Sequence, residues 1–130
     1  MLKTYLAIML GGAIGTGLRF GLANWLDGTH GGTFPIGVLV VNVTGCFVIG
    51  LYSSLTGPES NILVAPLTRQ VVMIGVLGGY TTFSSFSLNT LNLARSGEWW
   101  HAGWNVMLSV LLCLVAVWLG HVAASFINQR

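Results

Sequence analysis

The chain has 130 residues, which is enough for about one domain. Hydrophobic residues make up 54% of it and charged residues only 6%, and its mean hydropathy is +0.80. Soluble domains carry roughly 25% charged residues, so this composition argues against a water-soluble enzyme and places the chain in a lipid bilayer. Five basic and three acidic residues give a net charge of +2 without forming a cluster, so nothing indicates a nucleic-acid partner.

Four apolar stretches are long enough to cross a hydrocarbon core about 30 Å thick, which requires roughly 20 residues per helix. They lie at about 4–26, 35–55, 66–94 and 99–126. The first continues past twenty residues without an Ala-x-Ala cleavage site, so we interpret it as a retained span and not as a signal peptide. We therefore expect an all-α membrane protein with a single transmembrane domain over residues 1–130.

Turn-rich sequences separate the four spans, at 27–32, 56–65 and 96–98. We predict that these loops hold all three acidic residues: Asp27, Glu59 and Glu98.

Positive charge does little to fix the orientation of the spans. One side of the chain carries Lys3, Arg69 and Arg130, and the other carries Arg95, together with Arg19 if that side chain snorkels outward. Two interpretations remain open. The chain has one topology with a weak bias, or it inserts both ways and the two forms pair as an antiparallel dimer. Four helices are too few to enclose a comfortable pore, which favours the dimer.

The third span is unusual in length and composition. As one straight helix at 1.5 Å per residue, residues 66–94 would exceed the bilayer core. Its centre combines adjacent glycines with two β-branched threonines, which is a poor helix segment. We predict a break at 78–81, of the kind found at ion and substrate sites in membrane proteins. The alternative is that Gly75 and Gly79 only form a packing face.

Aromatic and polar residues follow the predicted break. On a helix, Phe83 and Phe86 share a face at spacing i, i+3, beside a polar stripe of Ser85, Asn89 and Asn92. Polar side chains within a span avoid lipid and face a bundle or a pore. An aromatic ring has a positive edge, so it can face an anion while remaining apolar.

Other intramembrane residues have ordinary interpretations beside the functional one. Asn42 in the second span and Ser109 in the fourth each suit an interhelical hydrogen bond. Arg19 either snorkels or anchors loop carbonyl groups. Cys46 and Cys113 lie in apolar runs, and we interpret them as buried thiols, not as a disulfide or a metal pair.

The residue types in the spans favour a small anion as cargo. No predicted span contains a carboxylate, which a proton-coupled multidrug exporter would be expected to carry. Hydroxyl and amide donors, ring edges and an arginine suit an anion, but they do not choose among fluoride, chloride and water. A hydrolase is disfavoured because a serine nucleophile needs a base within reach, and His121 lies near a membrane end. A non-transporting helical subunit is the remaining alternative.

Three motifs resemble the Fluc (CrcB) family of small bacterial fluoride channels. They read GGAIGTGLR at 11–19, GVLVVNVTGCF at 37–47 and GGYTTFSSFS at 78–87, and the last is the most specific. The resemblance implies a dual-topology homodimer that passively exports fluoride across the bacterial inner membrane through two antiparallel pores. The chain would then be a channel and not an enzyme.

The resemblance also assigns roles to residues of this sequence. The positions that match the family's pore are Asn42, Thr82, Phe83, Ser84, Ser85, Phe86 and, as a further contact, Ser109. Main-chain oxygens of Gly78 and Thr81 match those that hold a structural sodium ion at the dimer centre, and Arg19 matches a vestibule arginine. Asn89 stands where some members carry Glu, so a charge-linked role of that Glu does not transfer.

Overall fold

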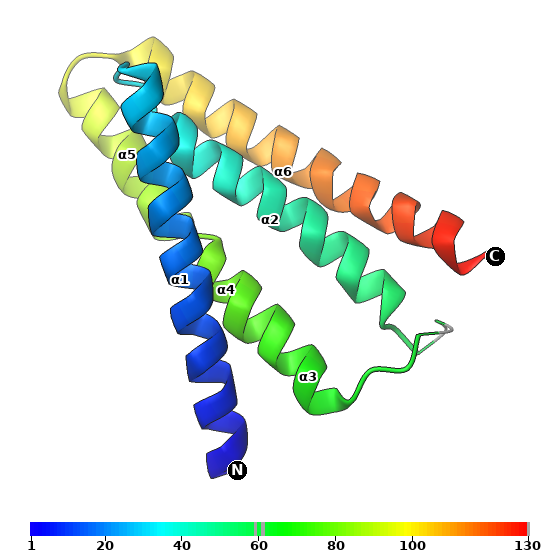
Figure 1. The fold of residues 1–130 in the computed structure, drawn as a ribbon. Helices are drawn as coiled ribbons and strands as arrows, with labels where there is room; N and C mark the ends of the chain where they lie inside the picture. Colours follow the sequence, from blue (N-terminus) through cyan, green and yellow to red (C-terminus); the bar gives the residue numbers. More distant parts are fainter. Residues whose placement is uncertain (59, 61, 130) are drawn as a thin grey trace.

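The computed structural model describes residues 1–58, 60 and 62–129 and is helical throughout its regular elements (Figure 1). Glu59, for which we predicted a loop, and Arg130, which we counted in the charge bias, lie outside the described residues. The elements in chain order are α1 (Leu2–His30), α2 (Ile36–Leu55), α3 (Pro66–Gln70), the π-helix η1 (Val71–Leu77), α4 (Gly78–Tyr80), α5 (Phe83–Arg95) and α6 (Trp99–Asn128).

Four helical stretches are long and apolar enough to cross a membrane: Leu2–His30, Ile36–Leu55, Pro66–Arg95 and Trp99–Asn128. The third is made of α3, η1, α4 and α5, with an interruption between the last two. The prediction of an all-α membrane protein with four spans and a broken third helix is therefore confirmed. Pro66 begins this stretch at the first helical position, where its missing N–H costs nothing.

The first helix runs beyond its predicted end, so the prediction that Asp27 lies in a loop is wrong. Helix α1 continues to His30 and ends at Gly31, whose φ of 59° lies in the left-handed region. Gly31 N–H donates to the Asp27 carbonyl, which closes the last turn. The Asp27 carboxylate accepts a 2.7 Å hydrogen bond from Gly37 N–H and ties the end of α1 to the start of α2.

The break divides the third span between two partners. Helices α2 and α6 lie side by side, while η1 and α4 pack against α1 and α5 packs against α6 (Figure 1). A straight third helix could pack against only one of these two groups of helices. The interruption therefore lets one span join the α1 side of the molecule to the α2–α6 side.

Two glycines before the break account for the close contact with α1. A Cβ added at Gly79 would lie 2.5 Å from the Gly12 carbonyl oxygen, and one at Gly75 would lie 2.8 Å from the Ile8 carbonyl oxygen. Gly75 and Gly79 thus form a packing face in addition to the break, so the alternative that they form only a packing face is wrong. Both glycines remain within the π- and α-helical segments, and the interruption falls after them.

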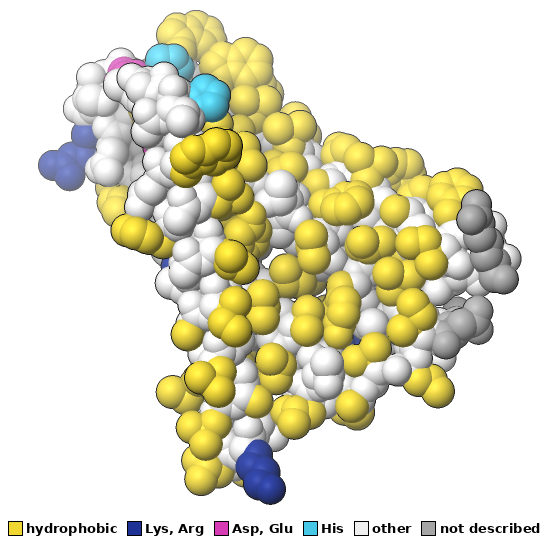
Figure 2. Space-filling view, viewed as in Figure 1, with side chains coloured by type: hydrophobic (Ala, Val, Ile, Leu, Met, Phe, Trp, Pro, Cys, Tyr) yellow, Lys and Arg dark blue, Asp and Glu magenta, His cyan; other side chains and the backbone are white. Residues whose placement is uncertain are grey.

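The outer surface of the chain is apolar. Large side chains such as Leu10, Phe20, Leu114 and Trp118 are more than half exposed. Figure 2 shows hydrophobic side chains spread over most of one face of the molecule. Contiguous apolar surface of this extent is unfavourable in water, so lipid or another membrane-embedded chain must cover it.

Candidate functional site

The break in the third span consists of Thr81 and Thr82. Thr81 has φ −83° and ψ 156°, and Thr82 has φ −152° and ψ 114°, so both are extended. Thr82 caps α5, because its hydroxyl oxygen accepts a 3.1 Å hydrogen bond from Ser85 N–H. The predicted break at 78–81 was placed too early: residues 78–80 remain helical, and the interruption extends one residue beyond the predicted range.

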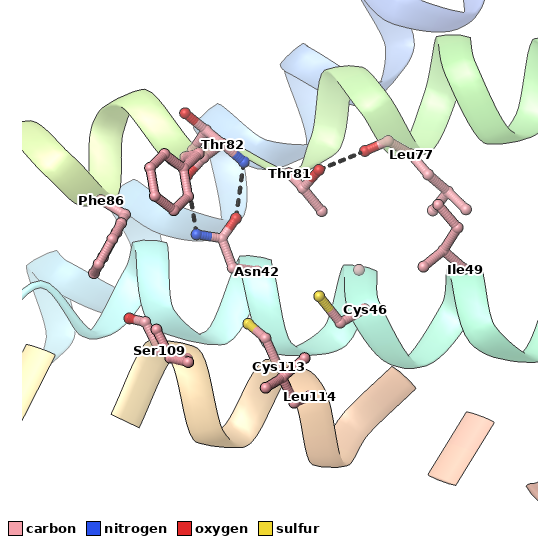
Figure 3. A pocket seen from close by; sticks show the side chains of 13 residues that line it. Asn42, Cys46, Ile49, Leu77, Thr81, Thr82, Phe86, Ser109, Cys113 and Leu114 are labelled. Atoms are coloured by element: carbon pink, nitrogen blue, oxygen red, sulfur yellow. Dashed lines mark hydrogen bonds between the residues drawn. The ribbon is translucent and has the colours of Figure 1, made fainter. Parts of the chain in front are cut away.

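Asn42 holds the break from the neighbouring helix. Its amide nitrogen donates to the Thr82 carbonyl oxygen at 3.0 Å, and its amide oxygen accepts from Thr82 N–H at 2.8 Å (Figure 3). Asn42 is buried, at 9% exposed. Backbone groups freed inside a membrane need partners from protein, and this one side chain supplies a donor and an acceptor to the same residue.

Two further carbonyl groups lose their helical partners at the break. In a continuous helix, Thr82 N–H would donate to the Gly78 carbonyl and Ser85 N–H to the Thr81 carbonyl. The first N–H donates instead to Asn42 and the second to the Thr82 hydroxyl. Gly78 is exposed on the surface of the chain. The arrangement therefore directs two main-chain oxygens away from helical hydrogen bonding.

The carbonyl oxygen of Gly79 is held by α1. Arg19 Nε donates to it at 3.2 Å and the Thr16 hydroxyl at 3.4 Å. Arg19 therefore holds a carbonyl group of the short helix α4, and not a loop carbonyl as one of the two interpretations had it. Thr16 was not predicted, although its position one turn before Arg19 on α1 places both side chains on one helix face.

The aromatic pair after the break is in contact. The ring centroids of Phe83 and Phe86 are 5.1 Å apart, with the rings inclined at 58°. Phe86 is buried at 8% exposed, whereas Phe83 is 76% exposed on the surface of the chain. One ring of the pair therefore lies inside the chain and the other on its outer face.

A cavity of about 380 Å³ brings most of the predicted pore residues together. Figure 3 shows Asn42, Thr82, Phe86 and Ser109 around it, with α2 and α6 forming its floor. The residues that line it include six of the predicted site positions: Asn42, Thr81, Thr82, Phe83, Phe86 and Ser109. Its wall is mostly apolar, so the hydroxyl and amide groups are the polar features within it.

Ser84 and Ser85 lie outside this cavity. The Ser84 hydroxyl is exposed and lies 3.3 Å from the Thr82 hydroxyl, while Ser85 Oγ accepts from that hydroxyl at 3.0 Å. Ser85 lines a second cavity of about 310 Å³ together with Thr16, Arg19 and Asn89. Thr82 lines both cavities, so its hydroxyl stands between the aromatic pair and the arginine.

The structure also brings together residues that we interpreted separately. Cys46 and Cys113 are only partly buried, and both line the 380 Å³ cavity. The interpretation of them as buried thiols is therefore corrected in its burial: each is a free cysteine that is only partly buried. Asn105, at 2% exposed, donates to the Thr90 hydroxyl at 2.8 Å and fastens α6 to α5, as an ordinary interhelical hydrogen bond.

A polar cluster joins two loops at one end of the spans. The Glu98 carboxylate accepts a 2.6 Å hydrogen bond from the Thr33 hydroxyl and lies 2.6 Å from His101 Nδ1. The hydrogen bond from Thr33, followed by that from His101, lowers the pKa of Glu98 from its ordinary value. The cluster fastens the loop before α2 to the start of α6, and Glu98 lies in a loop as predicted.

The fold and this site define a small, four-span membrane protein with a helix break beside an aromatic pair, the architecture of a channel or transporter. The family model described as "CrcB-like protein, Camphor Resistance (CrcB)" matches residues 6–121. The chain therefore belongs to the CrcB family and is a multi-pass inner-membrane protein.

Several curated relatives match nearly the whole chain, and each is named fluoride-specific ion channel FluC. The relative from Opitutus terrae is 57% identical over 128 residues, which cover 98% of this chain and 97% of the relative. Those from Methylocella silvestris and Rhodospirillum rubrum are 54% and 51% identical and cover 96% and 97% of this chain, and 95% and 98% of their own lengths. The family resemblance drawn from the three motifs is confirmed.

Proposed function

We propose that this protein is a fluoride channel that passively exports the ion through pores at a homodimer interface. The observation that supports the route is the position of the Phe83–Phe86 pair. The pair borders the cavity that also holds Asn42, Thr82 and Ser109. The family and the names of the relatives support fluoride as the ion and a channel, with no enzymatic reaction.

Fluoride is small and strongly hydrated, so a narrow pore must replace its water with other favourable contacts. In this proposal the Ser109 hydroxyl donates a hydrogen bond to the ion, and the Thr82 hydroxyl does so after it rotates away from Ser85 Oγ. The positive edges of Phe83 and Phe86 face it where no donor is available. Ser84 and Ser85 would extend the hydroxyl track from Thr82 toward the second cavity, and Arg19 would raise the local anion concentration there.

The proposed partner is a second copy of the chain in the opposite orientation. Phe83 is 76% exposed in the single chain, so its ring needs lipid or protein to cover it. A second copy across the break would cover Phe83 and complete a pore that four helices alone are too few to enclose. The nearly balanced positive charges of the loops suit insertion in both orientations.

The same arrangement fits a structural sodium ion. The carbonyl oxygens of Gly78 and Thr81 lose their helical donors, and Gly78 lies exposed on the surface that the partner would cover. Hard cations prefer oxygen ligands of this kind. Two copies would together offer four main-chain oxygens. When bound, the ion would neutralise these carbonyl dipoles and hold the two breaks together.

Purified protein in liposomes tests the function directly. We expect rapid fluoride efflux and little chloride efflux, with fluoride efflux reduced when sodium is replaced by a large organic cation. Equal release of the two halides would contradict fluoride selectivity, and no release of either would contradict a channel. Cross-linking between cysteines introduced at Gly78 of two copies, in an otherwise cysteine-free chain, tests the proposed dimer separately.

A further inference from the structure

Two thiols lie at the floor of the 380 Å³ cavity, one on each of two packed helices. Asn42 and Cys46 lie one turn apart on α2, and Ser109 and Cys113 lie one turn apart on α6. All four line the 380 Å³ cavity. In Figure 3 both sulfur atoms lie on the cavity side of their helices, below the break. The two cysteines therefore stand one helical turn from two of the proposed pore residues.

The helices that carry the two thiols are held in tight contact. The side chains of Cys46 and Cys113 line the same cavity, one from each helix. A Cβ added at Gly120 of α6 would collide with the Phe47 carbonyl oxygen of α2, so the two backbones approach more closely than larger residues permit. Because α2 and α6 are packed along their length, the spacing of the two sulfur atoms is fixed by the fold.

The chemistry of the site selects a soft cation with two ligands. In the described part of the chain, no group of three or more His, Cys, Asp and Glu side chains gathers, so a tetrahedral zinc-type centre has no support here. Thiolates favour soft metals. The cavity wall is largely apolar, where a net charge is unfavourable. A divalent soft cation with two thiolates is electrically neutral and meets this condition.

We propose that Cys46 and Cys113 of one chain form a two-coordinate site for thiophilic metal cations. With mercuric ion as the probe, each thiol loses its proton, two Hg–S bonds form, and two protons are released to solvent. The product is neutral and involves no oxidation or reduction. Both cysteines are partly exposed, so the ion can reach them from the cavity.

This site lies on the proposed ion route, and that part of the inference rests on the proposed function. A metal held between Cys46 and Cys113 would occupy space beside Asn42, Ser109 and Phe86. We therefore expect mercuric ion to block fluoride efflux, although neither cysteine is assigned a role in permeation. The metal site itself depends only on the two thiols and the packing of α2 on α6.

Binding stoichiometry tests the site without any measurement of transport. Purified protein is incubated with mercuric chloride, washed with a dilute monothiol that competes for ions held by nitrogen or by a single thiolate, and analysed for bound metal. We expect one mercury per chain, and two groups per chain with methylmercury, which occupies one thiol each. Cys46→Ala and Cys113→Ala should each retain far less mercuric ion and bind one methylmercury, which also shows that the variants are folded and accessible.

Other stoichiometries overturn the proposal. Two mercuric ions per chain would mean that each thiol reacts alone, and none would mean that the thiols do not bind the metal. One ion per chain that persists in the double variant Cys46→Ala/Cys113→Ala would place the metal elsewhere. An apparent dimer on a non-reducing denaturing gel, absent before treatment, would assign the bridge to two chains and contradict a site within one.

Efflux measurements on the same samples separate the metal site from the channel. Loss of fluoride efflux in the native chain, restored by excess dithiol and absent in the double variant Cys46→Ala/Cys113→Ala, supports both. One retained mercury with unchanged efflux would keep the metal site and contradict its place on the ion route. Failure of efflux before any metal is added would count against the proposed function and leave the binding result intact.

Discussion

The side-chain amide of Asn42 replaces the helical hydrogen bonding of Thr82. Asn42 Oδ1 accepts from Thr82 N–H at 2.8 Å, and Asn42 Nδ2 donates to the Thr82 carbonyl at 3.0 Å. The two residues are 40 positions apart in the sequence. Asn42, on the unbroken helix α2, therefore supplies the hydrogen-bond partners that the backbone of Thr82 lacks. The break in the third span is held in one defined conformation and is not a locally unfolded segment.

Replacing Asn42 by Ala should therefore destabilise the protein. Removal of the amide leaves a partly buried N–H and carbonyl of Thr82 unpaired, which costs about 2 kcal/mol in the free energy of unfolding. Fluoride efflux should fall as well, because the cavity loses the clamp at the break. Thermal unfolding in detergent and efflux from liposomes measure the two effects.

A second substitution at the same position separates donor from acceptor. Asn42→Asp keeps an acceptor for Thr82 N–H but, when ionised, turns a second acceptor toward the Thr82 carbonyl. We expect a stability loss at neutral pH similar to that of Asn42→Ala. Asn24→Ala, at an exposed position on α1, serves as the matched control and should remain within about 0.5 kcal/mol of the native chain. An Asn42→Ala variant as stable as this control would contradict the clamp.

The contact between α1 and the first half of the third span depends on the absence of a side chain at Gly15. A Cβ there would collide with the Val76 carbonyl oxygen and lie 2.8 Å from Tyr80 N. Because backbone atoms cannot rotate away, Gly15→Ala should cost about 3 kcal/mol, near the upper end of typical overpacking effects. Gly103→Ala has open space around it and should be neutral or stabilising by about 0.5–1 kcal/mol. Thermal unfolding of both variants provides the comparison.

Arg19 should stabilise the folded protein in addition to making the local electrostatic potential more positive. Its Nε–H donates to the Gly79 carbonyl, two residues before the break. Hydrogen bonds from charged groups contribute about 1.5–3 kcal/mol, so Arg19→Ala should lower the unfolding free energy by about 2 kcal/mol. Lys3→Ala, at the exposed N-terminal end, is the control with the same change of charge. Equal melting temperatures for the two variants would contradict a stabilising bond from Arg19 to Gly79 and support the snorkelling interpretation.

The sequence predicts the existence of the break more accurately than its position. Adjacent glycines and two threonines indicate a poor helix segment near 78–82, and that is correct. The glycines nevertheless remain helical, because Gly79 packs against Gly12 of α1 and this contact favours continuation of the helix. The interruption falls at the first residues whose backbone groups find other partners. Those partners come from Asn42, and a local pattern contains no information about a side chain 40 positions away.

The site residues were predicted by type and motif, and their grouping required the structure. Helical spacing correctly places Phe83 and Phe86 on one face. It does not reveal that Thr82 separates two cavities, or that Ser85 lies with Arg19 in the second. The thiol pair was missed for the same reason, since Cys46 and Cys113 are 67 positions apart and meet only because α2 packs on α6.

The aromatic pair should affect transport more than folding. We expect Phe86→Ile to retain the fold, since most of the side-chain volume remains, and to lower fluoride efflux about tenfold. That factor corresponds to a loss of about 1.4 kcal/mol of ion stabilisation by the ring edge. Phe126→Ile, at an exposed position near the end of α6, is the control and should leave efflux unchanged. Unaltered efflux in Phe86→Ile would contradict the proposal that the ring edge of Phe86 stabilises the ion.

The loop cluster around Glu98 should contribute stability only above acidic pH. Its pKa is lowered from the ordinary value of 4.5, first by the hydrogen bond from Thr33 and then by that from His101. A carboxyl group with a lowered folded-state pKa stabilises the fold above its unfolded value, and this stabilisation is lost as the pH falls through the folded value. Glu98→Gln should therefore melt below the native chain at pH 7, and the difference should shrink as the pH is lowered past 4.5 toward 3. Thr33→Val removes the main donor and should behave in the same way. A difference in melting temperature that stays constant from pH 7 to pH 3 would show that ionisation of Glu98 does not fasten these loops.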